Sequence, residues 1–338
     1  MRSMLAGIAL CAGQAALAPQ DLDRVVTTHA PAEAATAQVR VDSIAHVVTI
    51  RVGPLSLEGM EMPLEGHMGR DHVVFLTWPT DAYLTGYSVA FTDASGAPLP
   101  RDELHHAGVA NLGRRELLHD AYERMLAVGK ETEAVELPPV IGVPMHAGDS
   151  LAIYVGLHSP RGEWVTNAFV TLRLPFVPKR RHFNPLAVWP MHFELNFSGG
   201  ATTAYDLPPG RSARSDSFVM PLSGRLLAVG GHVHDYATAL RVSECRSGKV
   251  LVDLKAHRNA DGTIAGLDRF VFGFRDYGLR VEKGACYRVT AIYDNPTGRV
   301  LRDGGMASIG GPLMLDDERD WPALDKTHPA VAVDRDSL

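Results

Sequence analysis

The feature that most constrains the fold is a succession of short runs rich in Val, Ile, Thr and aromatic residues, each closed by Gly, Pro, Asp or Ser. Examples are "QVRVDSIAHVVTIRV", "HVVFLTW", "SLAIYVGLH", "RFVFGF" and "CYRVTAIYDN". Runs of this length and composition are typical of strands, and the 32 Gly and 22 Pro supply the turns between them. The sequence therefore predicts an all-β protein made of antiparallel sheets.

Two segments depart from this pattern. Between residues 114 and 128, apolar side chains recur at helical spacing, as at Leu118, Tyr122 and Met125, so one helix is predicted there. The tail from Asp316 is acidic, contains prolines and shows no periodicity, and no structure is predicted for it.

Length and a central breaker segment indicate how the strands divide. At roughly 150 residues per domain, 338 residues allow one large domain or two ordinary ones. The stretch "PFVPKRRHF" combines prolines with a basic cluster and places a boundary near residue 178. We expect two tandem jelly-roll-like β sandwiches, residues 38–178 and 179–316, with a flexible leader at 19–37 and a tail at 317–338.

The first eighteen residues have the character of a signal peptide. One Arg precedes the apolar run "MLAGIALCAGQAALA", which ends in an A-x-A pattern. This predicts an exported protein, periplasmic or secreted; lipoprotein processing at Cys11 is an alternative. No later segment has 18 uncharged apolar residues, so no stable membrane insertion is expected. In an oxidising compartment Cys245 and Cys286 could pair, but their separation in sequence leaves the pairing open.

Charge and motifs exclude several classes of function. With 33 Lys and Arg against 39 Asp and Glu, the net charge is −6, which argues against nucleic acid as a partner. The sequence contains no Walker loop, dinucleotide-binding glycine pattern or G-x-S-x-G elbow. Phosphate-binding and serine-hydrolase functions therefore have no support.

Histidines form the first candidate sites. His232 and His234 are alternate residues of a predicted strand, so both rings project from one face and could share an ion; two polar residues on a solvated face are the alternative. His105 and His106 are neighbours, whose side chains point to opposite faces of a regular strand. They can bind one metal only if the backbone bulges there, or if one ring reaches around through its other nitrogen.

Two more residues complete the candidate ligands. His158 ends an apolar strand, where a satisfied core or rim histidine is the alternative. Met306 lies in the glycine-rich segment "LRDGGMASIGG", where it either ligates through its thioether or fills a gap under a loop. Two imidazoles and a thioether suit a copper ion that cycles between oxidation states, whereas three histidines would also suit zinc.

Other polar residues lie near these motifs in the sequence. Asp235 follows His234 and could orient its ring, or could act as an exposed or capping carboxylate. The remaining candidates are histidines without a distinctive pattern, namely His67, His72, His146 and His192.

Taken in order, "LHHAGV", "YVGLH", "GGHVHDY" and "DGGM" resemble the copper type II, ascorbate-dependent monooxygenases, a family that includes peptidylglycine α-hydroxylating monooxygenase and dopamine β-monooxygenase. The segment "GGHVHDYATALRV" is more similar still to secreted relatives that include the stress-up-regulated nodulin proteins. The resemblance implies two β domains with one copper ion on each. It assigns His105, His106 and His158 to an electron-storing copper, and His232, His234 and Met306 to a catalytic copper that activates oxygen.

The resemblance further implies O2 and a small-molecule substrate as reactants, with ascorbate or a similar one-electron reductant as cosubstrate. The family enzymes hold a substrate carboxylate with an Arg and a Tyr, but this chain has Gly230 and, approximately, Gly310 at those places. The substrate is therefore left open. Two alternatives to a monooxygenase also stay open: a copper-binding or copper-handling protein without catalysis, and a β-sandwich interaction module.

Overall fold

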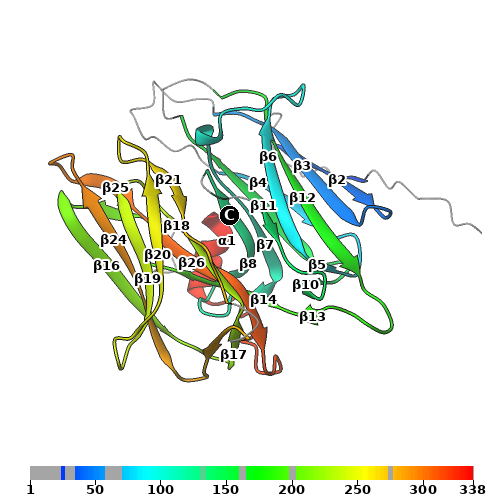
Figure 1. Cartoon of the computed structure of the whole chain (residues 1–338). Helices are drawn as coiled ribbons and strands as arrows, with labels where there is room; N and C mark the ends of the chain where they lie inside the picture. Colours follow the sequence, from blue (N-terminus) through cyan, green and yellow to red (C-terminus); the bar gives the residue numbers. More distant parts are fainter. Residues whose placement is uncertain are drawn as a thin grey trace, which may run out of the picture.

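The computed structural model describes residues 24–26, 35–57, 71–130, 132, 134–159, 165–197, 203–272 and 277–337. The predicted signal peptide and most of the predicted leader lie outside the described residues. The protein is all-β, as predicted, and its strands form two groups of sheets that lie side by side (Figure 1). We call strands β1 to β13 the first half and strands β14 to β26 the second half.

The first half is a sandwich of two sheets. Among the described residues, its larger sheet contains β1 (Arg24–Val26), β2 (Thr36–Asp42), β3 (Val47–Leu55), β12 (Ala168–Pro178), β5 (Ala82–Leu84), β10 (Ile141–Met145) and β13 (Leu186–Ala187), with β6 (Gly86–Thr92) and β9 (Val135–Glu136) paired at its side. Its smaller sheet contains β4 (His72–Thr77), β11 (Ser150–Leu157), β7 (Leu104–Arg115) and β8 (Tyr122–Gly129). A short 3-10 helix, η1 (Arg101–Glu103), precedes β7.

The second half repeats this design. One sheet contains β22 (Phe270–Val271), β18 (Ala228–Val233), β26 (Ala307–Leu315), β17 (Gly224–Leu226), β23 (Leu279–Val281) and β14 (Trp189–Glu194). The facing sheet contains β16 (Gly210–Val219), β24 (Cys286–Asn295), β19 (Ala237–Glu244), β20 (Val250–Arg258) and β21 (Ile264–Leu267), and a separate ribbon pairs β15 (Tyr205–Leu207) with β25 (Leu301–Gly305).

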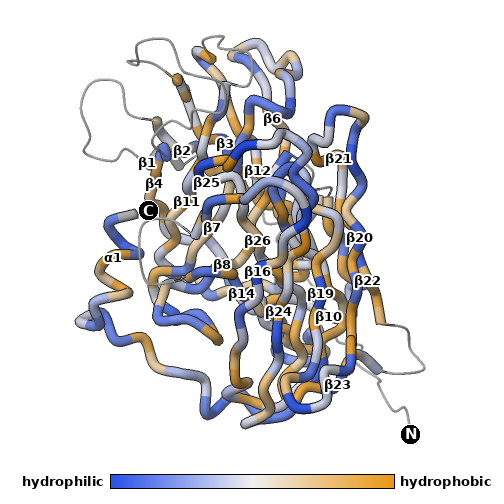
Figure 2. The backbone as a smooth tube through the Cα atoms, turned by 90° about the vertical axis from the view of Figure 1, so that its left-hand side faces the viewer, coloured by the Kyte–Doolittle hydropathy of each residue, from blue (hydrophilic) through white to orange (hydrophobic). Residues whose placement is uncertain are grey.

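Each half has its own hydrophobic core, because alternate strand positions are apolar and turn inward. In the first half, β3 and β12 contribute fully buried residues such as Ile50 and Leu172, which pack with Ile153 of β11. In the second half, Val233 of β18 and Ile309 of β26 belong to a separate cluster. Figure 2 shows hydrophobic positions recurring along the strands of both halves. Strand pairing in the first half extends past the boundary expected near residue 178, because β13 runs parallel to β10.

The helix predicted between residues 114 and 128 is wrong. Residues 122–129 form β8, which pairs antiparallel with β7 from His106 to Arg115. The pairing satisfies the backbone groups of both strands and buries Leu126 and Val128 in the first core. Local apolar spacing favoured a helix, but pairing with a neighbouring strand decided the conformation.

The tail also differs from the expectation of no structure. It includes helix α1 (Pro329–Ser337), whose Val331 packs with Ala110, Tyr122 and Ala152 on the outer face of the smaller sheet of the first half. Asp334 of α1 accepts the backbone N–H of Tyr122 and forms an ion pair with Arg124.

The tail and β14 join the two halves through buried groups. The Arg114 guanidinium lies between the rings of Trp189 and Trp321, 3.4 and 3.8 Å from their centroids. We call this contact the aromatic–ionic junction; its residues are Arg114, Glu116, Glu123, Arg124, Trp189, His192, Trp321 and Asp334.

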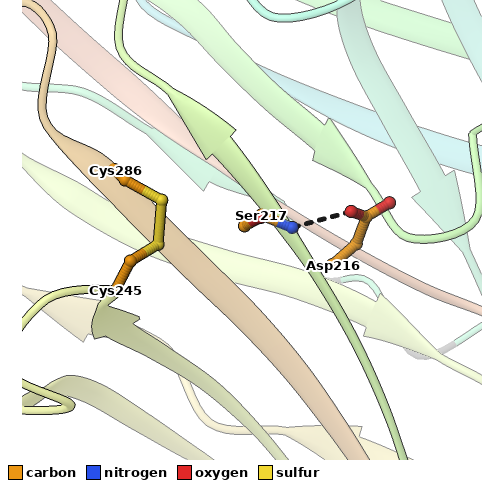
Figure 3. Close-up of a disulfide and its surroundings, with 4 residues drawn as sticks. All are labelled: Asp216, Ser217, Cys245 and Cys286. Carbon is orange, nitrogen blue, oxygen red and sulfur yellow. Dashed lines mark hydrogen bonds between the residues drawn. A yellow bond between two sulfur atoms is a disulfide. The ribbon is translucent and has the colours of Figure 1, made fainter.

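Cys245 and Cys286 form a disulfide (Figure 3), with their Cα atoms 5.4 Å apart. Cys245 follows β19 and Cys286 begins β24; the two strands pair, and this brings the cysteines together. A disulfide is typical of proteins that mature in an oxidising compartment. In the part of the chain that the structure describes, no helix is both long and apolar enough to cross a membrane.

Candidate metal centre

A bulge at the start of β7 turns both neighbouring histidines toward one point. His106 pairs with Gly156 of β11 and Leu104 pairs with Leu157, so the register leaves His105 as the extra residue. A bulge of this kind breaks the alternation of side chains. As a result, Nδ1 of His105 lies 2.6 Å from Nδ1 of His106.

A carboxylate that sequence reasoning missed fixes the orientation of His106. Oδ2 of Asp71 lies 2.7 Å from Nε2 of His106, so Nδ1 is the ring nitrogen that faces His105. A carboxylate behind an imidazole is a common way to orient a metal ligand. Gly156 is needed for this approach, because a Cβ there would lie 2.8 Å from Oδ1 of Asp71 and 3.0 Å from Nε2 of His106.

His158 lies directly after β11, beside the bulge. Its backbone N–H donates to the carbonyl of Glu103 at 2.8 Å, and its ring centroid is 6.2 Å from that of His105. Burial lowers the pKa of His158 below its ordinary value, so the neutral imidazole is favoured.

His232 and His234 project from the face of the second half that is turned away from its core. Val229 and Val233 of β18 point inward, so His232 points to the opposite face, and His234 directly follows the strand. The rings of His232 and His234 have centroids 5.3 Å apart and lie nearly perpendicular.

Met306 is held next to His234 by its backbone. The His234 N–H donates to the carbonyl of Met306 at 3.2 Å, and the Tyr293 hydroxyl donates to the same carbonyl. The Met306 N–H donates to Tyr293 Oη at 3.2 Å. The segments that carry the second predicted trio are therefore adjacent in space.

The two trios meet at His105. The ring centroids of His105 and His234, which come from opposite halves, are 5.9 Å apart. Burial, reinforced by repulsion from His106 and His234, holds the pKa of His105 far below its ordinary value. A neutral imidazole keeps the lone pair that a metal ion needs.

Ring spacing shows whether these imidazoles suit a common ion. With nitrogen–metal distances of about 2.0–2.1 Å, two imidazoles on one ion have centroids about 4.5 to 6.4 Å apart for ligand angles between about 90° and 180°. The centroids of His105 and His106 are 4.7 Å apart, and the other neighbouring pairs also fall in this interval. Within the described ranges, no three His, Cys, Asp or Glu side chains are placed to hold a metal ion as they stand, so these rings would have to rearrange to ligate one.

The remaining candidates have other roles. Oδ1 of Asp235 accepts the backbone N–H of Ile264 at 2.8 Å and lies 3.2 Å from Nζ of Lys130, so this carboxylate caps a strand and pairs across the halves. His72 hydrogen-bonds the carbonyl of Ser56, and His192 lies beside Glu116 in the aromatic–ionic junction. His146 lies 3.9 Å from Asp149, and His67 is outside the described residues.

Comparisons with known proteins do not assign this chain to a family. A scan against protein-family models and a search of curated proteins both find no match. Among solved structures, the chain is similar to the Faustovirus major capsid protein at 8% identity, with a TM-score of 0.23, over 89% of this chain and 82% of that one. A likeness of this size carries no argument about function.

Proposed function

We propose that this chain is an exported copper protein that uses O2 and an external one-electron reductant such as ascorbate to hydroxylate a small molecule. The observation that carries the proposal is the convergence of His105, His106 and His158 with His232 and His234 at the meeting point of the two halves. These are the residues that the resemblance to the copper monooxygenases assigns as ligands, together with Met306.

The donor set suits copper. Imidazole binds copper in both oxidation states, and a thioether favours Cu(I), so a site of His232, His234 and Met306 would hold an ion that changes oxidation state. Copper supplies one-electron transfer from the reductant and the activation of O2. Overall, R–H and O2 with two electrons and two protons give R–OH and H2O, and two ascorbate molecules supply one electron and one proton each.

The chain's own residues have distinct tasks in this proposal. Asp71 holds the proton on Nε2 of His106, which leaves Nδ1 as the ligating atom. Tyr293 and the His234 N–H hold the backbone of Met306, so that the segment after β25 stays beside β18. Gly230 and Gly310 are register partners on β18 and β26. Because both are glycines, neither position offers a side chain to a substrate carboxylate.

One observation favours a second function, a copper-handling protein without a hydroxylation reaction. The rings of His105 and His234 are 5.9 Å apart, so the two ligand trios touch in this arrangement. A substrate that reacts between two separated copper ions would require the halves to move apart.

The proposal is tested by loading the full chain with copper and measuring oxygen uptake with ascorbate. Wild type should bind about two ions, and His105→Ala and His232→Ala should each lose about one. Oxygen uptake should depend on copper and fall in both variants, whereas His257→Ala, at an exposed position, should match wild type. A copper stoichiometry that is unchanged in both His105→Ala and His232→Ala would falsify the ligand assignment.

Candidate substrates separate the two functions. If a substrate increases oxygen uptake and is recovered with one added oxygen atom, the protein is a monooxygenase. Copper-dependent uptake that no candidate substrate changes would favour the copper-handling function.

A further inference from the structure

We call His105, His106, His158, His232 and His234 the histidine cluster. His105 lies at its centre rather than at the edge of one trio. Its ring has His106 at 4.7 Å, His158 at 6.2 Å and His234 at 5.9 Å, measured between centroids. The distance across the halves is thus shorter than one of the distances within the first trio. All three fall within the interval of about 4.5 to 6.4 Å expected for imidazoles that share an ion.

The backbone is fixed on each side of these two rings. The bulge between β7 and β11 fixes His105, whose ring is largely buried. His234 is fixed from both directions, because its N–H donates to Met306 and its carbonyl accepts the N–H of Ala237 at 3.3 Å. The backbone positions of both residues are therefore fixed on either side of the contact.

An ion pair beside the cluster connects the two halves. Lys130 directly follows Gly129, the register partner of His106, and Asp235 directly follows His234. Their side chains lie 3.2 Å apart and are about one third exposed. The ion pair therefore connects the two halves at positions close to His106 on one side and to His234 on the other.

We infer that the first metal ion to bind is held jointly by the two halves, with His105 and His234 as ligands from opposite sides. This inference rests on the proposed function and specifies how its metal centre is assembled. A jointly held ion ties the halves together, so the affinity of each half for metal depends on residues of the other.

A double-substitution cycle tests the inference. Cu(I) is titrated without oxygen into the full chain in competition with a chromogenic chelator, for wild type, His105→Ala, His234→Ala and the double variant. Each single substitution should weaken the tighter-binding ion by at least about tenfold, and the double variant should be little weaker than either, because both remove the same ion. His257→Ala, at an exposed histidine outside the cluster, serves as the matched control.

The outcomes separate this inference from the proposed function. If each single substitution removes a different ion and the double variant loses both, the sites are independent; the joint ion is then wrong and the proposed function survives. If wild type binds no Cu(I), both fail. If an Ala variant does not fold, His105→Asn and His234→Asn carry the same cycle with a polar side chain of smaller volume, and the same two patterns decide.

Discussion

The two regions that join the halves differ in the charges they bring together. The aromatic–ionic junction pairs opposite charges, as in Arg124 with Asp334, and covers an arginine with two tryptophan rings. The histidine cluster instead packs groups of one kind, which would repel each other if protonated. The first region has the composition of a structural contact, whereas the second has the composition of a site that receives a cation.

The largest expected effect is on the junction. Asp334→Ala removes the partner of Arg124 and the acceptor for the backbone of Tyr122, and should lower the free energy of unfolding by about 3–5 kcal/mol. Denaturant unfolding measures this change. Asp253→Ala is the control, because its pair with Arg241 is about 40% exposed and should cost less than about 1 kcal/mol. Equal losses in both variants would mean that the buried contacts of Asp334 stabilise the fold no more than an exposed ion pair does.

The histidine cluster should respond to a change that barely affects folding. Asp71→Ala removes the carboxylate that orients His106 and should weaken copper binding about 10- to 100-fold. A competition titration measures the affinity, and Asp93→Ala, at an exposed turn, is the control. Copper affinity equal to that of wild type would show that the carboxylate plays no part in ligand orientation.

The junction also predicts a dependence of stability on pH. Burial raises the pKa of Glu123 from 4.5 to about 8, against the opposing effect of Arg114. Between these values the unfolded chain releases a proton that the folded chain retains, so stability falls as pH rises from about 5 to 8, by at most about 1.4 kcal/mol per pH unit. Glu123→Gln should flatten the curve of unfolding free energy against pH. A curve with the same slope in variant and wild type would contradict the neutral carboxyl group.

The smallest effect is expected at the ion pair between the halves. Both side chains of the Lys130–Asp235 pair are about one third exposed, so Lys130→Ala should lower the free energy of unfolding by less than about 1 kcal/mol. Chemical denaturation measures this loss. A loss as large as that of Asp334→Ala would make this pair, and not the junction, the main link between the halves.

The same two regions show what the sequence could and could not predict. Strand alternation predicted that His232 and His234 share a face, and a bulge at His105 was one of two ways in which the adjacent histidines could bind one metal. The helix at 114–128 was predicted wrongly, because apolar spacing is local whereas β8 is formed by pairing with β7. Asp71 went unrecognised because it lies directly before β4, far from His106 in the sequence, and only the order β4-β11-β7 places it behind His106. The docking of α1 and the contact between the two trios are likewise long-range contacts that no local sequence pattern indicates.

The most direct test of the account is the copper content of two double variants beside wild type, measured by mass spectrometry after equilibrium dialysis. His105→Ala/His232→Ala removes a ligand from each trio, whereas His146→Ala/His257→Ala removes two histidines that are more than half exposed and lie outside the cluster. We expect about two copper ions per chain in wild type and in the exposed-site variant, and none in the cluster variant. A cluster variant that retains the copper content of wild type would contradict the central claim that these histidines hold the metal.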